Sequence, residues 1–283
     1  MLSGALAALG GALCWTLASS LWRRLPTALS APQLNLLKNL LALATLSPWL
    51  LALPVSEIKA VLLLGLSGML GIAAGDSLYF AALRRLGTRR TLTLDAGGPA
   101  VTALLGLVAL SEVPSVRQWF GIALISAALW LVAVQRSPEG RQDRWGVALA
   151  LAALLCGSGG ALLARAALRD SGIEPLTAAA WRLLAASLVL LPLLPGLWRR
   201  SWGPRPAQVR WPLATAATLL GTTAGIALQQ TALQRLPGAL AVALLATAPV
   251  MALPLSALEG DRPGWQGMAA AVLALLGVSW VVF

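Results

Sequence analysis

Ten apolar segments, each close to twenty residues long, constrain this chain more than any other feature of its sequence. They lie between charged or proline-rich breaks, at about 2–22, 31–53, 58–83, 88–110, 116–135, 145–167, 175–197, 209–234, 238–258 and 264–283. About 20 apolar residues are enough to cross a bilayer as a helix. The segments are rich in Ala and Leu and lack the alternating pattern of a membrane barrel. They predict an all-α polytopic membrane protein with ten transmembrane helices.

The composition agrees with this class. Of the 283 residues, 58% are hydrophobic and 11% are charged, which excludes a water-soluble globular enzyme. The formal net charge of +11 comes from Arg residues that cluster between the apolar segments. We interpret them as loop charges near membrane lipids and expect no nucleic-acid partner.

Several kinds of chemistry are missing from the sequence. There is no His, and Cys14 and Cys156 both fall inside apolar segments, so neither a metal site nor a disulfide framework is expected. No phosphate-binding Gly-rich loop and no Ser–His pair is present. We therefore expect no enzyme and no cofactor. Residues 1–13 lack a positively charged start, so they are interpreted as part of the first span and not as a signal peptide.

The chain contains an internal repeat. At shifts of 142 to 150 residues the same or a chemically similar residue recurs, in the pairs Cys14 and Cys156, Pro32 and Pro175, Lys38 and Arg182, Gly71 and Gly221, Gly75 and Gly225, and Pro99 and Pro249. We expect two five-helix halves, 1–140 and 141–283, joined near 137–143. Because each half has an odd number of spans, the second enters the membrane from the opposite side, as in the inverted repeats of secondary transporters.

Lys and Arg are distributed unequally over the two sides of the predicted membrane protein. The loops after spans 1, 3, 5, 7 and 9, called here the odd-loop face, carry fourteen: Arg23, Arg24, Arg84, Arg85, Arg89, Arg90, Arg136, Arg141, Arg144, Arg199, Arg200, Arg205, Arg210 and Arg262. The even-loop face carries five: Lys59, Arg117, Arg165, Arg169 and Arg235. Since cytoplasmic loops are enriched in these residues, the count places both termini outside the cytoplasm.

Two short motifs occur once in each half. A Glu between spans is followed by a helix bearing Gln and Gly, at Glu112 with 118–121 and at Glu259 with 265–267, and an Ala-Leu turn recurs at 82–86 and 232–236. With these motifs occurring twice and in this order, the chain resembles the drug/metabolite transporter superfamily, specifically its ten-helix members with two EamA-type domains. The resemblance implies a secondary transporter, often an exporter of amino acids, bases or other small metabolites, with a cavity formed by spans 1–4 and 6–9. It also implies an inner-membrane protein with both termini in the cytoplasm, which is opposite to the Lys and Arg count.

Three ionisable side chains lie inside spans of the first half. Lys38, Asp76 and Asp95 each lie roughly 10 to 12 Å below the odd-loop face at 1.5 Å per residue, so they are able to meet. In one interpretation Lys38 keeps one carboxylate ionised while the other binds a proton or a substrate amine. In a second, the charges form a permanent structural cluster, and in a third they snorkel to the membrane surface. Tyr79, one turn after Asp76, adds hydrogen-bonding capacity.

The second half carries different polar residues at the matching places. Arg182 stands in the place of Lys38, Gln229 and Gln230 lie near the place of Asp76, and no acid falls inside its spans. Arg182 is able to hold a substrate carboxylate, which with an aspartate for the amine suits a zwitterionic amino acid. Alternatively, Arg182 snorkels to the headgroups.

Two prolines and a tryptophan complete the candidate residues. Pro99 and Pro249 fall near the middle of spans 4 and 9, where they predict kinks that serve as hinges or are merely tolerated. Trp15 lies deep enough to stack on a substrate, although packing also explains it. Glu112 and Glu259 precede the next spans, where a carboxylate favours a helix N-terminus, and are not counted in the site.

These features favour a secondary transporter of a small polar metabolite, driven by protons or exchange. Its site is expected at the midplane between the halves, which rock in alternating access. The alternatives are a flippase of a lipid-linked carrier, a non-transporting membrane scaffold or receptor, and an intramembrane enzyme that uses Asp76 and Asp95 as an acid pair.

Overall fold

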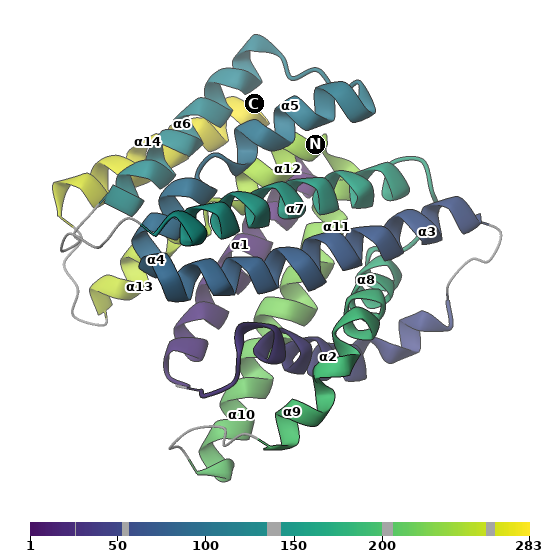
Figure 1. Ribbon diagram of the computed structural model, residues 1–283. Coiled ribbons are helices and arrows are strands. Elements are labelled where there is room, and N and C mark those ends of the chain that lie inside the picture. The colour runs from purple at the N-terminus through teal and green to yellow at the C-terminus, as the bar shows by residue number, and fades with distance from the viewer. Residues whose placement is uncertain (26, 53–56, 135–142, 200–205, 259–263) are drawn as a thin grey trace.

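The computed structural model describes residues 1–25, 27–52, 57–134, 143–199, 206–258 and 264–283, and within these ranges it contains helices and no strand. The elements, shown in Figure 1, are α1 (Leu2–Arg23), α2 (Ala31–Leu50), α3 (Ile58–Ser67), η2 (Gly68–Asp76), α4 (Ser77–Asp95), α5 (Gly98–Leu110), α6 (Val116–Val134), α7 (Arg144–Leu168), α8 (Pro175–Leu190), η3 (Leu191–Leu193), α9 (Leu194–Arg199), α10 (Ala207–Thr218), η4 (Leu219–Ala224), α11 (Gly225–Arg235), α12 (Gly238–Leu245), α13 (Ala248–Leu258) and α14 (Trp265–Val282). Most of the junction expected near 137–143 lies outside the described residues.

Helix length and hydropathy confirm the predicted membrane class. Among the described residues, eight helical stretches are long and apolar enough to cross a membrane, and α5 is a shorter apolar helix. α2 has the length of a span, but Gln33, Asn35, Lys38 and Asn39 lower its hydropathy. Together these segments account for the ten expected spans, so the chain is an all-α polytopic membrane protein.

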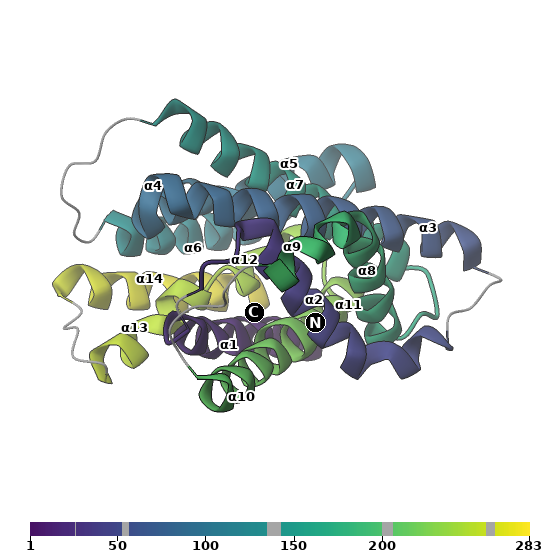
Figure 2. The same cartoon turned by 60° about the horizontal axis from the view of Figure 1, so that its bottom comes forward.

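The two halves pack against each other through matching helices. α1 of the first half packs on α11 of the second, and α7 of the second half packs on α4 of the first. Likewise α2 packs on α8, α5 on α12 and α6 on α14; the α6–α14 pair is visible in Figures 1 and 2. The α2–α8 and α6–α14 contacts join equivalent helices, and the α1–α11 and α4–α7 contacts are reciprocal, as a two-fold relation between inverted repeats requires.

The third span of each half contains a π-helical segment at the matching place, η2 in the first half and η4 in the second. π-helices are rare and frequently occur at functional sites. Side chains from neighbouring helices donate to carbonyl groups in both segments. Asn35 Nδ2 donates to the carbonyl of Ile72 at 2.7 Å, and Trp15 Nε1 donates to that of Gly221 at 2.9 Å. Both π segments are thus held by the first two helices of the chain.

Spans 4 and 9 are each broken directly before the predicted prolines. Pro99 lies in the first turn of α5 and Pro249 in that of α13, so each proline begins a new helix, where its missing N–H costs little. Thr16 Oγ1 donates to the carbonyl of Ala248 at 2.8 Å, and Thr102 donates to Ser158 at 2.9 Å. Contrary to the expected kink within a continuous helix, the structure has discontinuous helices, which are common in transporters.

The turn between spans 3 and 4 differs from its equivalent in the second half. α11 ends at Arg235 because Pro237 restricts Leu236 to an extended backbone, with φ −122° and ψ 152°. The corresponding part of the first half has Gly87 and no proline, and the backbone of α4 is helical from Ser77 to Asp95. The break that the sequence predicts between these two spans is therefore absent from the structure, because the backbone there is helical throughout.

Polar caps fix where two of the helices begin. Ser30 and Gln33 form a reciprocal capping box at the start of α2. Asp143 accepts hydrogen bonds from the backbone N–H groups of Trp145 and Gly146 at the start of α7. The bond from Gly146, together with nearby Arg85, lowers the pKa of the Asp143 carboxyl.

Candidate functional site

Lys38 and Asp76 form an ion pair where α2 meets η2. Lys38 Nζ lies 2.5 Å from Asp76 Oδ2, and it also lies 5.6 Å from the centroid of the Phe80 ring. The Lys38 side chain is 13% exposed and that of Asp76 is 37% exposed. The structure thus brings together two of the three ionisable residues predicted to meet. The more exposed face of the pair is the carboxylate.

Arg182 of α8 lies beside this pair and is almost completely buried, with 2% of its surface exposed. Its Nη1 donates to Gln229 Oε1 at 3.2 Å, whereas its Nε has no hydrogen-bond partner among the described residues. Its Nη2 lies against Gly71 of η2, the segment that ends at Asp76. Because Arg182 is buried, the alternative of snorkelling to the headgroups does not describe its position.

Amide side chains extend the cluster into α11 and α2. Gln230 is fully buried, donates to Gln229 Oε1 at 3.4 Å, and has no partner for its own Oε1 among the described residues. Asn39 is also fully buried, and neither its Nδ2 nor its Oδ1 has a described partner. Buried polar groups in proteins are almost always hydrogen-bonded. The unsatisfied Arg182 Nε and Gln230 Oε1, together with the Lys38–Asp76 pair, mark this region as the candidate site.

Asp95 lies at the end of α4 and takes no part in the Lys38–Asp76 pair. It is exposed and makes no hydrogen bond or ion pair with the described residues. Tyr79 lies in the first turn of α4, three residues after Asp76.

The indole N–H of Trp15 donates to the carbonyl of Gly221, so this group already has a hydrogen-bond partner within the protein. A Cβ at Gly225 would lie 2.5 Å from Trp15 Nε1, so this glycine is what gives the indole its place. The residue equivalent to Trp15 in the second half is Gly157, which has open space where a Cβ would be. The repeat is thus asymmetric at this position.

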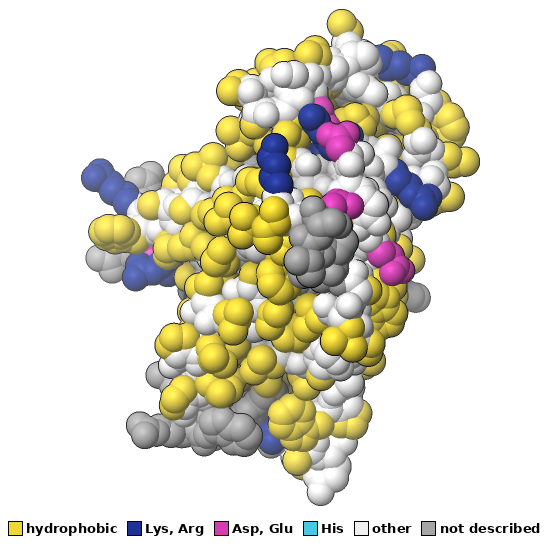
Figure 3. Space-filling view, turned by 90° about the vertical axis from the view of Figure 1, so that its right-hand side faces the viewer, with side chains coloured by type: hydrophobic (Ala, Val, Ile, Leu, Met, Phe, Trp, Pro, Cys, Tyr) yellow, Lys and Arg dark blue, Asp and Glu magenta, His cyan; other side chains and the backbone are white. Residues whose placement is uncertain are grey.

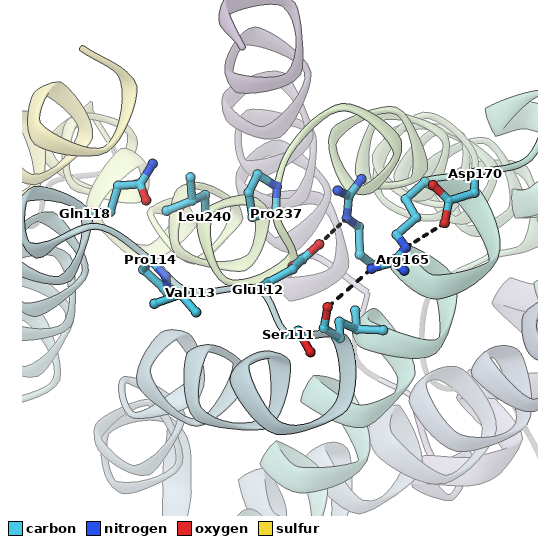
Figure 4. A pocket seen from close by; sticks show the side chains of 11 residues that line it. Ser111, Glu112, Val113, Pro114, Gln118, Arg165, Asp170, Pro237 and Leu240 are labelled. Atoms are coloured by element: carbon cyan, nitrogen blue, oxygen red, sulfur yellow. Dashed lines mark hydrogen bonds and ion pairs between the residues drawn. The ribbon is translucent and has the colours of Figure 1, made fainter.

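A second group of charges lies on the even-loop face, around a cavity of about 370 Å³. Arg165 Nε of α7 lies 2.7 Å from Glu112 Oε1, and Figure 4 shows the two side chains pointing toward each other. Arg165 Nη1 also donates to the carbonyls of Leu233 and Gln234 at the end of α11. Glu112 Oε2 accepts from Gly238 N at 2.7 Å, at the start of α12. We call these contacts the Glu112–Arg165 latch.

The latch was missed by the sequence analysis, which placed Glu112 at the start of the span that follows it. The structure instead uses Glu112 to cap α12 of the opposite half. The repeated Glu between spans was the available signal, but its partner is more than fifty residues away in the sequence. The equivalent Glu259 lies outside the described residues.

The outer surface fits a protein that lies in lipid. Figure 3 looks onto the side of the molecule at the right of Figure 1, where acidic and basic side chains gather in the upper part. Hydrophobic side chains cover much of the remainder of that view. Exposed Leu, Val and Trp residues are numerous elsewhere, for example Val108, Leu155, Trp265 and Leu275. A soluble monomer rarely exposes so much apolar surface.

Comparison with known proteins identifies the family. The model of the EamA-like transporter family matches residues 2–134 and again residues 144–283. The chain belongs to this family. Each half of this EamA-like protein is thus one copy of the family's domain, which confirms the resemblance stated from the sequence motifs. No curated protein matches the chain.

A solved crystal structure shows the same fold. It covers 100% of the EamA-like chain and 97% of its own chain, with a TM-score of 0.80 at 19% sequence identity. At this identity the likeness concerns the arrangement of the helices alone. Family membership makes the chain a membrane transporter.

Proposed function

We propose that the chain is a secondary transporter that exports small polar metabolites, such as amino acids, across the cytoplasmic membrane. The observation that carries this proposal is the polar cluster between the halves. Lys38 and Asp76 come from the first half, and Arg182 and Gln229 from the second. A site shared by two inverted repeats changes its access when one repeat moves against the other.

Two features of the fold support alternating access. Spans 4 and 9 are broken at equivalent places, before Pro99 and Pro249, and such breaks give each half a hinge. The Glu112–Arg165 latch ties α7 to the start of α12 and the end of α11 on the even-loop face. In our proposal the latch closes this face and must open during each transport cycle.

Protons are the proposed coupling ion. Asp76 keeps part of its carboxylate exposed beside Lys38, and Asp95 is an exposed carboxylate at the end of α4. Protonation of Asp76 would weaken its attraction to Lys38, which lets the charge state of the pair influence how the halves pack. On the Lys and Arg count, we propose that the odd-loop face is cytoplasmic and that both termini lie outside.

The proposal is tested by loading proteoliposomes with a mixed pool of metabolites and following protein-dependent loss by mass spectrometry. The pool contains amino acids, nucleobases, sugars and phosphorylated compounds, and the assay is run with and without a pH gradient. The expected result is a selective, saturable loss of one class that changes with the gradient. Empty liposomes and heat-inactivated protein serve as controls.

Loss of no solute by folded protein would contradict transport of soluble metabolites. That result would favour lipid-linked cargo, whose movement across the bilayer is measured by a flippase assay with fluorescent lipids. Chemical alteration of a solute without a dependence on any gradient would instead indicate an enzyme.

A further inference from the structure

The second half of the chain contributes a buried cation that lacks a carboxylate of its own. Among the described residues, no Asp or Glu lies within ion-pair distance of Arg182. Arg182 packs against Gly71 of η2, the segment that ends at Asp76, and Asp76 is already bonded to Lys38 at 2.5 Å. Two cations therefore share one carboxylate at this place. An uncompensated charge in a buried site is costly unless an ion or a ligand completes it.

Gln229 occupies the position that a negatively charged oxygen would fill. Its amide Oε1 accepts from Arg182 Nη1 at 3.2 Å and from Gln230 Nε2 at 3.4 Å, both long for hydrogen bonds. A carboxylate oxygen accepts from a guanidinium over a shorter distance and about twice as strongly as a neutral group. The Arg182 Nε, which has no partner among the described residues, is able to donate to the second oxygen of such a carboxylate.

We infer that Arg182, with Gln229 and Gln230 beside it, is a subsite for a single carboxylate group of the transported solute. This inference rests on the proposed transport function and narrows it to carboxylate-bearing solutes. Lys38 and Arg182 carry two positive charges and Asp76 carries one negative charge, so one further negative charge makes the cluster neutral. A doubly charged phosphate would give the cluster a net negative charge. The planar guanidinium also matches the two coplanar oxygens of a carboxylate.

Access to this subsite leads past residues that retain some exposure. Gln229 is half-buried, and the Asp76 side chain is 37% exposed. Gln229, which accepts from Arg182 Nη1, is more exposed than the guanidinium, so we propose that a solute meets Gln229 first. If the Gln229 side chain moves away, the Arg182 Nη1 becomes available beside the Nε, which has no described partner. Two charge-assisted hydrogen bonds to a carboxylate then replace one hydrogen bond to an amide oxygen.

Ligand-dependent thermal stability of the purified full chain in detergent tests this inference. The probes are matched pairs, each proteinogenic amino acid with its primary amide and each short monocarboxylic acid with its amide, together with inorganic phosphate. Each pair differs in the carboxylate alone. The variants are Arg182→Lys, which keeps the charge but loses the fork, and Arg182→Gln, which loses both. Lys59→Gln, at an exposed position on the even-loop face, is the matched loss of one positive charge.

We expect at least one acid to raise the unfolding temperature while its amide does not. The apparent affinity for that acid should fall at least about tenfold in Arg182→Lys and become undetectable in Arg182→Gln, with Lys59→Gln unchanged. Equal stabilisation by acid and amide, stabilisation by phosphate but by no acid, or wild-type affinity in Arg182→Lys would overturn the assignment. If Arg182→Gln does not fold, Arg182→Lys decides.

Flux measured separately in proteoliposomes distinguishes this inference from the proposed function. An acid that binds through Arg182 but does not cross the membrane supports the subsite and contradicts transport. Saturable flux restricted to solutes without a carboxylate supports transport and overturns the subsite. Stabilisation by no member of the panel also overturns the subsite.

Discussion

Loss of the Glu112 carboxylate should weaken the chain by far more than loss of a surface charge. Glu112 and Arg165 are 13% and 15% exposed, and their atoms lie 2.7 Å apart. Removing one partner of a buried pair costs about 3 to 5 kcal/mol. We place Glu112→Gln at the lower end, about 3 kcal/mol, because the amide still accepts one hydrogen bond and the site is not fully dry. Arg165→Gln also loses two bonds to α11 carbonyls, so its cost should be about 4 kcal/mol.

A double-mutant cycle isolates the interaction between the two side chains. Unfolding free energies of the wild type, both single variants and Glu112→Gln/Arg165→Gln are measured by denaturant titration in mixed micelles. We expect a coupling energy of about 2 kcal/mol. The neighbouring Arg169–Asp170 pair is the control, because it also lies at 2.7 Å but its side chains are 38% and 77% exposed. Its coupling should be at most about 1 kcal/mol. Equal coupling in the two cycles would refute the reasoning.

Three further predictions concern the repeat and the orientation. Gly225→Ala should destabilise the protein by about 1 to 3 kcal/mol because its Cβ would lie 2.5 Å from Trp15 Nε1, whereas Gly157→Ala, with open space around it, should stabilise by about 0.5 to 1 kcal/mol; thermal unfolding compares the two. Trp15→Phe should cost about 1 to 3 kcal/mol, since it leaves the Gly221 carbonyl without its indole donor, and a cost near zero in the same assay would contradict this role. A reporter active only outside the cytoplasm should be active when fused after Phe283, and activity of only a cytoplasmic reporter would reverse the assigned orientation.

Much of the fold could be predicted from the sequence because a bilayer leaves few choices. A span must satisfy its own backbone, so long apolar segments report helices directly. The halves could be recognised because paired residues such as Gly71 and Gly221 recur at a nearly constant shift. Helix breaks were harder to place. Pro99 and Pro249 were expected within continuous spans, yet each begins a separate helix.

The candidate site was predictable where depth alone decides which side chains meet. Lys38 and Asp76 were expected at the same level, and the structure pairs them. Depth does not fix rotation about a helix axis, so the separation of Asp95 from this pair was not foreseen. The π-helical segments and the latch depend on packing between the halves. A single sequence read span by span does not contain that information.

The most direct test of the account is solute flux through an Asp76→Asn variant in proteoliposomes under a pH gradient. Asn keeps the shape of the side chain but removes the charge that holds Lys38. We predict that gradient-dependent flux is lost while the protein stays folded by circular dichroism. If the unpaired Lys38 destabilises the variant, Lys38→Met/Asp76→Asn removes both charges and should also lack gradient-dependent flux. Wild-type flux with an unchanged response to the pH gradient in either variant would contradict a transport site built on this ion pair.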